Sequence, residues 1–207
     1  MNRTTHLLEG DLTPELRDRY LAGGQLAVDT ETRGLKIHRD RLCLVQMCDA
    51  NGEITLVRVT QSSAPLLQEV LESPKVEKIF HFARFDLAAL RHWLGIQVAP
   101  VFCTKIASRM VRTYTDRHGL KELTKELLNI ELDKEQQSSD WANPNLSDKQ
   151  ISYAANDVIH LIALRNQLVA MLERESLLSL AQSTMAFLPH RVSLDLLGWE
   201  EDIFSHV

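Results

Sequence analysis

The sequence has few cysteines, and they do not form a metal-binding pattern. Its 207 residues include three cysteines, an odd number, and none has the spacing of a zinc site. A His-Glu-x-x-His motif is also absent. We therefore expect Cys43, Cys48 and Cys103 to be reduced thiols in or near the core of a cytoplasmic protein.

Long apolar runs and an excess of basic charge are missing as well. No stretch approaches the roughly 20 apolar residues that cross a bilayer, and the first twelve residues lack the apolar segment of a secretory signal. We expect no membrane association. The net charge is −5, with 23 Lys and Arg against 28 Asp and Glu, which argues against a general DNA coat protein or repressor. A metal-dependent processing enzyme stays open, because bound divalent cations can bridge carboxylates to phosphate.

The order of hydrophobic patterns predicts an α/β fold. With 44% hydrophobic residues the chain can bury a core of one globular domain. Strands are predicted at 25–30, 42–48, 54–59, 76–82 and 98–102. The first three would start the sheet in antiparallel fashion, around a turn at 49–52. Helices are predicted at 14–23, 65–71, 86–94, 105–111 and about 120–128, followed by one long helix from Ser147 past Leu168. Strands first and strand–helix alternation afterwards indicate a mixed sheet flanked by helices.

Two carboxylates lie at the end of the first central strand. Side chains alternate between the faces of a strand, so Asp29 and Glu31 point the same way and repel each other unless a positive group lies between them. Asp86 follows another buried strand, in the first turn of a helix. Each acid also has an ordinary interpretation, as a solvated strand end or as a favourable charge at a helix N-terminus.

A tyrosine and a fourth carboxylate share one face of the long helix. Tyr153 and Asp157 are four residues apart, with small alanines beside them. Alone, such a pair is an ordinary local contact. Together with Asp29, Glu31 and Asp86, it matches what hard, oxygen-preferring Mg²⁺ or Mn²⁺ requires. Two such cations can cleave a phosphodiester, with Tyr153 placed to orient or deprotonate the attacking water.

These residues lie in segments that resemble the three motifs of the DEDD exonuclease superfamily. VDTET (28–32), HFARFD (81–86) and YAAND (153–157) match in order and spacing, and the tyrosine four residues before Asp157 is typical of the tyrosine branch. CTKIASRM from Cys103, HGLKEL from His118 and the SSDWANP stretch from Ser138 resemble the ribonuclease D-like subgroup.

The resemblance implies a ribonuclease H-like mixed sheet flanked by helices, with a helical C-terminal part. We expect a single 3′-5′ exonuclease domain over 1–207, with its catalytic core at about 25–170 and an extension at about 171–207. No extra C-terminal nucleic-acid-binding module is expected. This compact length resembles the nano-RNase C type of oligoribonuclease, which implies release of nucleoside 5′-monophosphates from short RNA, including dinucleotides. It also implies a homo-oligomeric ring, such as an octamer, to which the apolar C-terminal segment could contribute.

The expected catalytic residues are Asp29, Glu31, Asp86, Tyr153 and Asp157. The four carboxylates are also the expected metal ligands, and Tyr153 is not a ligand. Expected substrate contacts lie beside them: Thr30, Leu35, His81, Phe82 and Arg84. Leu35 is expected to wedge against the terminal base, as a leucine does in relatives. A second basic and aromatic cluster has no assigned role: Arg112, Tyr114, Arg117, His118 and Lys121.

Three other functions fit the same fold. One is ribonuclease D-like trimming of structured RNA 3′ ends, and another is a DNA 3′-5′ exonuclease, because no residue pattern reports on the 2′-hydroxyl. The third is an inactive scaffold, which would not need all five chemical positions.

Overall fold

A six-stranded mixed sheet forms the centre of the protein, whose computed structural model describes residues 5–132, 139–199 and 201–206. The strand order is β1-β4-β3-β2-β5-β6. The strands are β1 (Thr5–Glu9), β2 (Gln25–Thr32), β3 (Leu42–Asp49), β4 (Ile54–Arg58), β5 (Glu77–Phe80) and β6 (Val101–Cys103). The antiparallel pairing of β2, β3 and β4 is confirmed, whereas β1 with β4, β2 with β5, and β5 with β6 are parallel.

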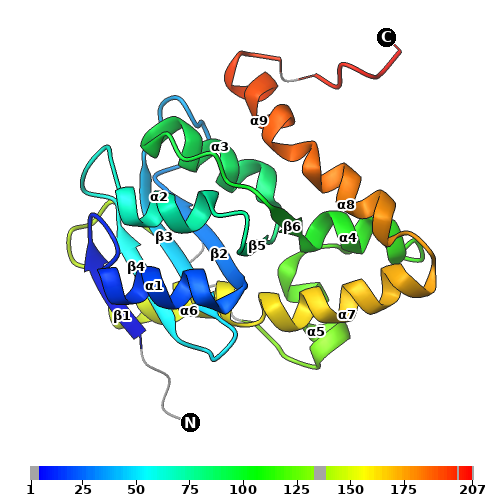
Figure 1. The fold of residues 1–207 in the computed structure, drawn as a ribbon, viewed down its shortest axis with the longest axis horizontal. Helices are drawn as coiled ribbons and strands as arrows, with labels where there is room; N and C mark the ends of the chain where they lie inside the picture. The colour runs from blue at the N-terminus through cyan, green and yellow to red at the C-terminus, as the bar shows by residue number, and fades with distance from the viewer. Residues whose placement is uncertain (1–4, 133–138, 200, 207) are drawn as a thin grey trace.

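Helices cover both faces of this sheet. They are α1 (Pro14–Gly23), α2 (Pro65–Glu72), α3 (Ala83–Leu94), α4 (Thr104–Val111), α5 (Leu120–Leu128), α6 (Asp148–Ile159), α7 (Leu161–Arg174), α8 (Leu178–Ala186) and α9 (Leu188–Leu196). Figure 1 shows α1, α2 and α3 in front of the sheet, α6 behind it, and α4, α5 and α7 beyond β6. The predicted α/β class, with its mixed sheet and helical C-terminal part, is confirmed.

Local sequence signals explain where several elements begin. The Thr13 hydroxyl caps α1 by accepting from the amide of Leu16, and proline follows at the first helical position. Ser147 and Gln150 form the predicted capping box of α6, each side chain accepting from the other residue's backbone amide. Both helix starts could be predicted from the sequence because the residues that form each cap are close together in the chain.

The predicted elements differ from the structure in several places. The strand predicted at 98–102 is the shorter β6, which begins at Val101. The edge strand β1 was not predicted, because its short sequence alternates weakly and it forms only by pairing with β4. The long helix is broken at His160: α6 packs on β2, β3 and β4, whereas α7 packs on α4 and α5, so the chain must change direction. Helix α3 begins at Ala83, three residues before Asp86.

The core lies on the two faces of the sheet and beneath α7. β3 is buried along its whole length, and Cys43, Cys48 and Cys103 are buried, as expected, with no disulfide among them. Among the residues described, no helix is long and apolar enough to cross a membrane. Residues 133–138, which contain the first residue of the SSDWANP stretch, lie outside the described part.

Candidate active site

The three sequence motifs meet at one pocket of about 380 Å³. Because β2 and β5 are parallel, their C-terminal ends lie at the same edge of the sheet, where β2 brings the first motif and the turn after β5 brings the second. Helix α6 contacts β2 and supplies the third motif. The pocket is lined by Asp29, Thr30, Glu31, Leu35, His81, Phe82, Phe85, Asp86, Lys105, Gly119, Leu120, Lys121, Leu132, Tyr153 and Asp157.

Three of the carboxylates form a tight group. One oxygen from each of Asp29, Glu31 and Asp157 lies within 4.8 Å of the other two. Asp29 pairs with Gln46 across β2 and β3, and the Gln46 amide lies 3.5 Å from the Asp29 carboxylate. An all-oxygen donor set of this kind fits a hard divalent cation.

Asp86 lines the same pocket but lies outside that tight group. Its side chain is 4% exposed, and the Thr30 hydroxyl donates to its Oδ1 at 2.6 Å. Thr30 points away from its neighbours Asp29 and Glu31 along β2, so this bond ties the strand to the first turn of α3. The structure therefore shows Thr30 as a partner of Asp86.

Tyr153 lies one helical turn before Asp157 on α6. Its hydroxyl is hydrogen-bonded to the Asp157 carboxylate. The Trp141 ring is 4% exposed and packs against the Tyr153 ring, with centroids 6.0 Å apart. Trp141 therefore fixes the orientation of the tyrosine, a role that the SSDWANP stretch alone did not reveal.

Burial and mutual repulsion raise the pKa of these acids. Burial and the charges of Asp86, Asp157 and Glu31 raise the pKa of Asp29 well above its usual range. Burial, with Asp157 and Asp86, raises the pKa of Glu31 to about 9.

The third carboxyl and the tyrosine are shifted in the same direction. Burial raises the pKa of Asp86 to about 7, against the lowering effect of the Thr30 hydroxyl. Burial, the charges of Asp157 and Glu31, and the hydrogen bond to Asp157 raise the pKa of Tyr153. A pocket in which acids hold protons so tightly favours the entry of positive charge.

The predicted substrate contacts fall into two groups. Leu35 is 84% exposed at the pocket mouth, on a loop tied down by a bond from the Lys36 amide to the Asp40 carboxylate. Phe82 is 48% exposed and has a left-handed backbone, φ 67°. The His81 ring bonds the Thr104 hydroxyl at 2.9 Å. All three line the acidic pocket.

Arg84 points elsewhere. Its guanidinium makes two 2.6 Å bonds to the Asp195 carboxylate on α9, and Arg191 bonds the same carboxylate at 2.7 Å. Arg84 lines a neighbouring pocket of about 580 Å³, which shares Leu35, Phe82 and Phe85 with the acidic one. Its contact with substrate stays a prediction.

Two lysines in the pocket were not predicted as site residues. Lys105 belongs to the CTKIASRM segment and Lys121 to HGLKEL, and both line the pocket. The motif matches were visible in the sequence, but lysines in the first turn of a helix gave no reason to place them beside the carboxylates.

A mixed sheet that gathers these three motifs into one acid-lined pocket defines the DEDD class of exonuclease. The chain belongs to the 3′-5′ exonuclease family, whose model matches residues 10–173. The resemblance read from VDTET, HFARFD and YAAND is confirmed, and this domain is of the ribonuclease D-like type.

Curated relatives support the same family assignment. Ribonuclease D of Gluconacetobacter diazotrophicus is 35% identical over 165 residues, which cover 79% of this chain and 42% of the relative. The chain thus spans about two fifths of the length of such curated relatives.

Two solved structures are similar over nearly the whole chain. Brucella melitensis NrnC bound to pGG is 48% identical, with a TM-score of 0.93 and 100% of both chains covered. NrnC with bound Mg²⁺ is 47% identical, with a TM-score of 0.93, covering 99% of this chain and 100% of that one.

Proposed function

We propose that this protein is a divalent-cation-dependent 3′-5′ exoribonuclease that releases nucleoside 5′-monophosphates from short RNA, including dinucleotides. The observation that carries this proposal is the tight group of Asp29, Glu31 and Asp157, with Asp86 in the same pocket. The full-length similarity to NrnC, which was solved bound to pGG, supports a short oligonucleotide as substrate.

The carboxylates are the residues that would hold the cations, Mg²⁺ or Mn²⁺, in a two-ion site. Their oxygens suit such ions, and the NrnC structure with bound Mg²⁺ supports this choice. Bound there, divalent cations supply an activated water and stabilise the leaving oxygen of a phosphodiester.

The other side chains position the substrate and the water. Tyr153, held between Trp141 and Asp157, orients the attacking water beside the carboxylates. Leu35 and Phe82 are exposed at the mouth and offer apolar faces to the terminal base. His81 completes this wall.

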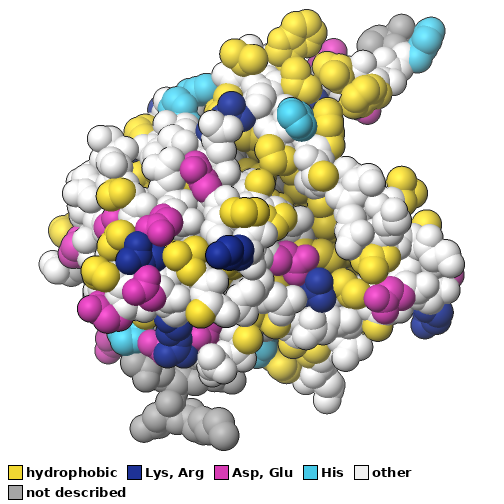
Figure 2. Space-filling view, in the orientation of Figure 1, with side chains coloured by type: hydrophobic (Ala, Val, Ile, Leu, Met, Phe, Trp, Pro, Cys, Tyr) yellow, Lys and Arg dark blue, Asp and Glu magenta, His cyan; other side chains and the backbone are white. Residues whose placement is uncertain are grey.

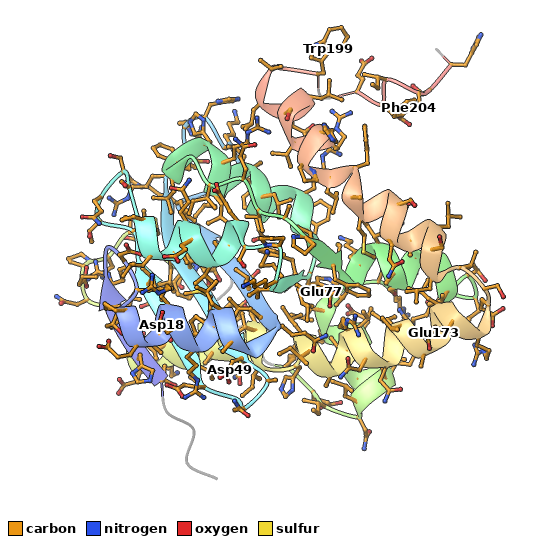
Figure 3. All side chains as sticks on the ribbon, in the orientation of Figure 1. Asp18, Asp49, Glu77, Glu173, Trp199 and Phe204 are labelled. Carbon is orange, nitrogen blue, oxygen red and sulfur yellow. The ribbon has the colours of Figure 1, made fainter. Side chains whose placement is uncertain are left out.

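We further propose that the protein assembles into a homo-oligomeric ring. Large apolar side chains are exposed on α8, α9 and the segment that follows: Leu180, Phe187, Leu197, Trp199 and Phe204. Figure 2 shows hydrophobic side chains gathered over α9 and beyond it, and Figure 3 shows Trp199 and Phe204 standing away from the sheet. Light scattering on the purified protein should give the mass of an oligomer, and Trp199→Ser with Phe204→Ser should lower it. A cytoplasmic location, consistent with three cysteines that form no disulfide with one another, stays a prediction.

Trimming of structured RNA is the second candidate, favoured by the ribonuclease D relatives. The test compares degradation of a 5′-labelled RNA dinucleotide with that of a longer RNA, at matched concentration with Mg²⁺ or Mn²⁺. Strong preference for the dinucleotide supports our proposal. Equal or better cleavage of the longer RNA in single-nucleotide steps supports exonuclease activity but refutes the dinucleotide preference. Matched DNA substrates show whether the protein prefers RNA or DNA.

A further inference from the structure

Two unassigned lysines line the acidic pocket from helices that carry none of its carboxylates. Lys105 lies in the first turn of α4, and Lys121 lies in the first turn of α5. A lysine is unfavourable there, because the N-terminal end of a helix is already positive. Helix stability therefore does not explain these positions, so the reason for them must lie in the pocket.

Neither ammonium group makes a close salt bridge with a carboxylate of the described residues. Within the described ranges, Lys105 and Lys121 take part in no ion pair, although the pocket that they line also contains acids. Lys125, one turn further along α5, has Glu131 at 2.6 Å. The charge of Lys121 also helps to lower the pKa of Glu131, but Lys125 makes the close ion pair. The two pocket lysines therefore lack a close ion pair of their own and can meet a ligand, whereas Lys125 already has a partner.

Lys105 is held in place by an aromatic ring. Its Nζ lies 4.3 Å from the centroid of the Phe82 ring, a cation–π contact. Phe82 in turn is the second residue of the second motif and forms part of the pocket wall. The ammonium group therefore lies beside the surface proposed to hold a base, near the phosphate that the sugar joins to that base.

Lys121 is held through a buried arginine. The side chain of Arg112 is fully buried, and it donates to the Arg117 carbonyl at 2.7 Å and to the Ser108 hydroxyl at 2.9 Å. The same hydroxyl lies 2.9 Å from Nδ1 of His118. These bonds fix the segment between α4 and α5, which leads directly into Lys121. The backbone position of this lysine is thereby set before substrate arrives, which reduces the entropy lost on binding.

We propose that Lys105 and Lys121 form a phosphate-binding pair that holds the oligonucleotide against the carboxylates. The inference rests on the proposed function and names further substrate-binding residues for it. The phosphate has two possible sources in a short RNA: the linkage between nucleotides or a 5′-terminal phosphate. Both offer the same charged oxygens to an ammonium group.

The test uses Lys105→Met and Lys121→Met, which keep chain length and apolar bulk but remove the charge. Steady-state kinetics with 5′-phosphorylated and 5′-hydroxyl dinucleotides should show KM raised about tenfold or more for each variant, with kcat changed far less. Fluorescence polarisation in Ca²⁺ should show the same loss of binding without turnover. Lys121→Arg should bind nearly as well as the unmodified protein, and Lys125→Met is the matched control, without effect.

The outcomes distinguish the two phosphate sources, and they distinguish a failure of the lysine pair from a failure of the proposed exonuclease function. An equal loss on both dinucleotides assigns the linking phosphate, and a loss only on the 5′-phosphorylated one assigns the terminal phosphate. If both methionine variants bind and cleave like the unmodified protein, the lysine pair is refuted while the exonuclease stands. If the unmodified protein cleaves neither dinucleotide, the proposed function fails, and binding alone then decides on the lysines.

Discussion

Removing one pocket carboxylate should stabilise the metal-free protein while abolishing its activity. Asp157→Asn keeps the shape of the side chain and its ability to accept from Tyr153, but it removes a charge that lies within 4.8 Å of Asp29 and Glu31. At that separation and an effective dielectric constant of about 20, each ionised pair repels by about 3 kcal/mol. The repulsion acts only in the folded state, so the variant should unfold less readily.

The gain should grow with pH. Burial and the neighbouring acids raise the pKa of Glu31 from 4.5 to about 9, so the folded protein binds more protons than the unfolded chain between these values. The contribution of Glu31 to stability is therefore present at low pH and is lost as pH rises towards 9. We expect Asp157→Asn to gain about 3 kcal/mol at pH 9 and clearly less at pH 6.

Thermal unfolding in EDTA at both pH values measures this effect. For a domain of this size the gain at pH 9 corresponds to a Tm increase of about 6–12 °C. Asp116→Asn, an exposed acid outside the pocket, is the control and should change stability by less than about 0.5 kcal/mol. An Asp157→Asn variant that is no more stable than the unmodified protein at pH 9 would refute the claim that these carboxylates repel one another.

Three further substitutions test the surroundings of the pocket. Thr30→Val removes the donor to Asp86 and should lower kcat/KM about 10–100-fold, because the carboxylate loses its orientation. Burial lowers the pKa of Lys78 to about 7, so above that pH the unfolded chain binds more protons than the folded protein. The free energy of unfolding, relative to that of Lys78→Met, should therefore rise by about 1.4 kcal/mol per pH unit from pH 7 to 10. Urea unfolding at several pH values measures this slope. Arg112→Met should cost about 3 kcal/mol in urea unfolding, near the lower end for a broken buried pair because its partner Glu126 is 41% exposed and can rehydrate.

Each of these has a control or a contradicting result. Thr32→Val, which loses a bond to the Gly34 carbonyl instead, should affect activity far less than Thr30→Val. A stability difference for Lys78→Met that stays constant with pH would mean that Lys78 remains charged, held by the Ser73 and Ala99 carbonyls that its ammonium contacts. Arg112→Met with unchanged unfolding would show that the buried network does not hold the α4–α5 segment.

The sequence predicted those parts of the site that depend on local spacing. Strand alternation placed Asp29 and Glu31 on one face, and helix periodicity paired Tyr153 with Asp157; the structure brings all four to one pocket. The strands β2 to β6 were also predicted approximately, because buried apolar runs and turn residues mark them in the sequence.

What the sequence did not predict depends on distant partners. Arg84 meets Asp195, 111 residues further along the chain, and no local pattern announces that pair. Strand β1 exists through its pairing with β4. The break at His160 was missed because a leucine stripe continues through α7 without proline or glycine, so the change of direction is set by packing alone. A single, self-contained exonuclease domain over 1–207 stays a prediction.

The most direct test of the account follows the products formed from a short 5′-labelled RNA with Mg²⁺. We predict that the protein shortens the RNA one nucleotide at a time from the 3′ end and releases nucleoside 5′-monophosphates. Asp29→Asn should release none, although it should still be folded and unfold in a cooperative transition. Internal cleavage, early release of the 5′ label, or full activity in Asp29→Asn would contradict the assignment of this pocket as a 3′-5′ exonuclease site.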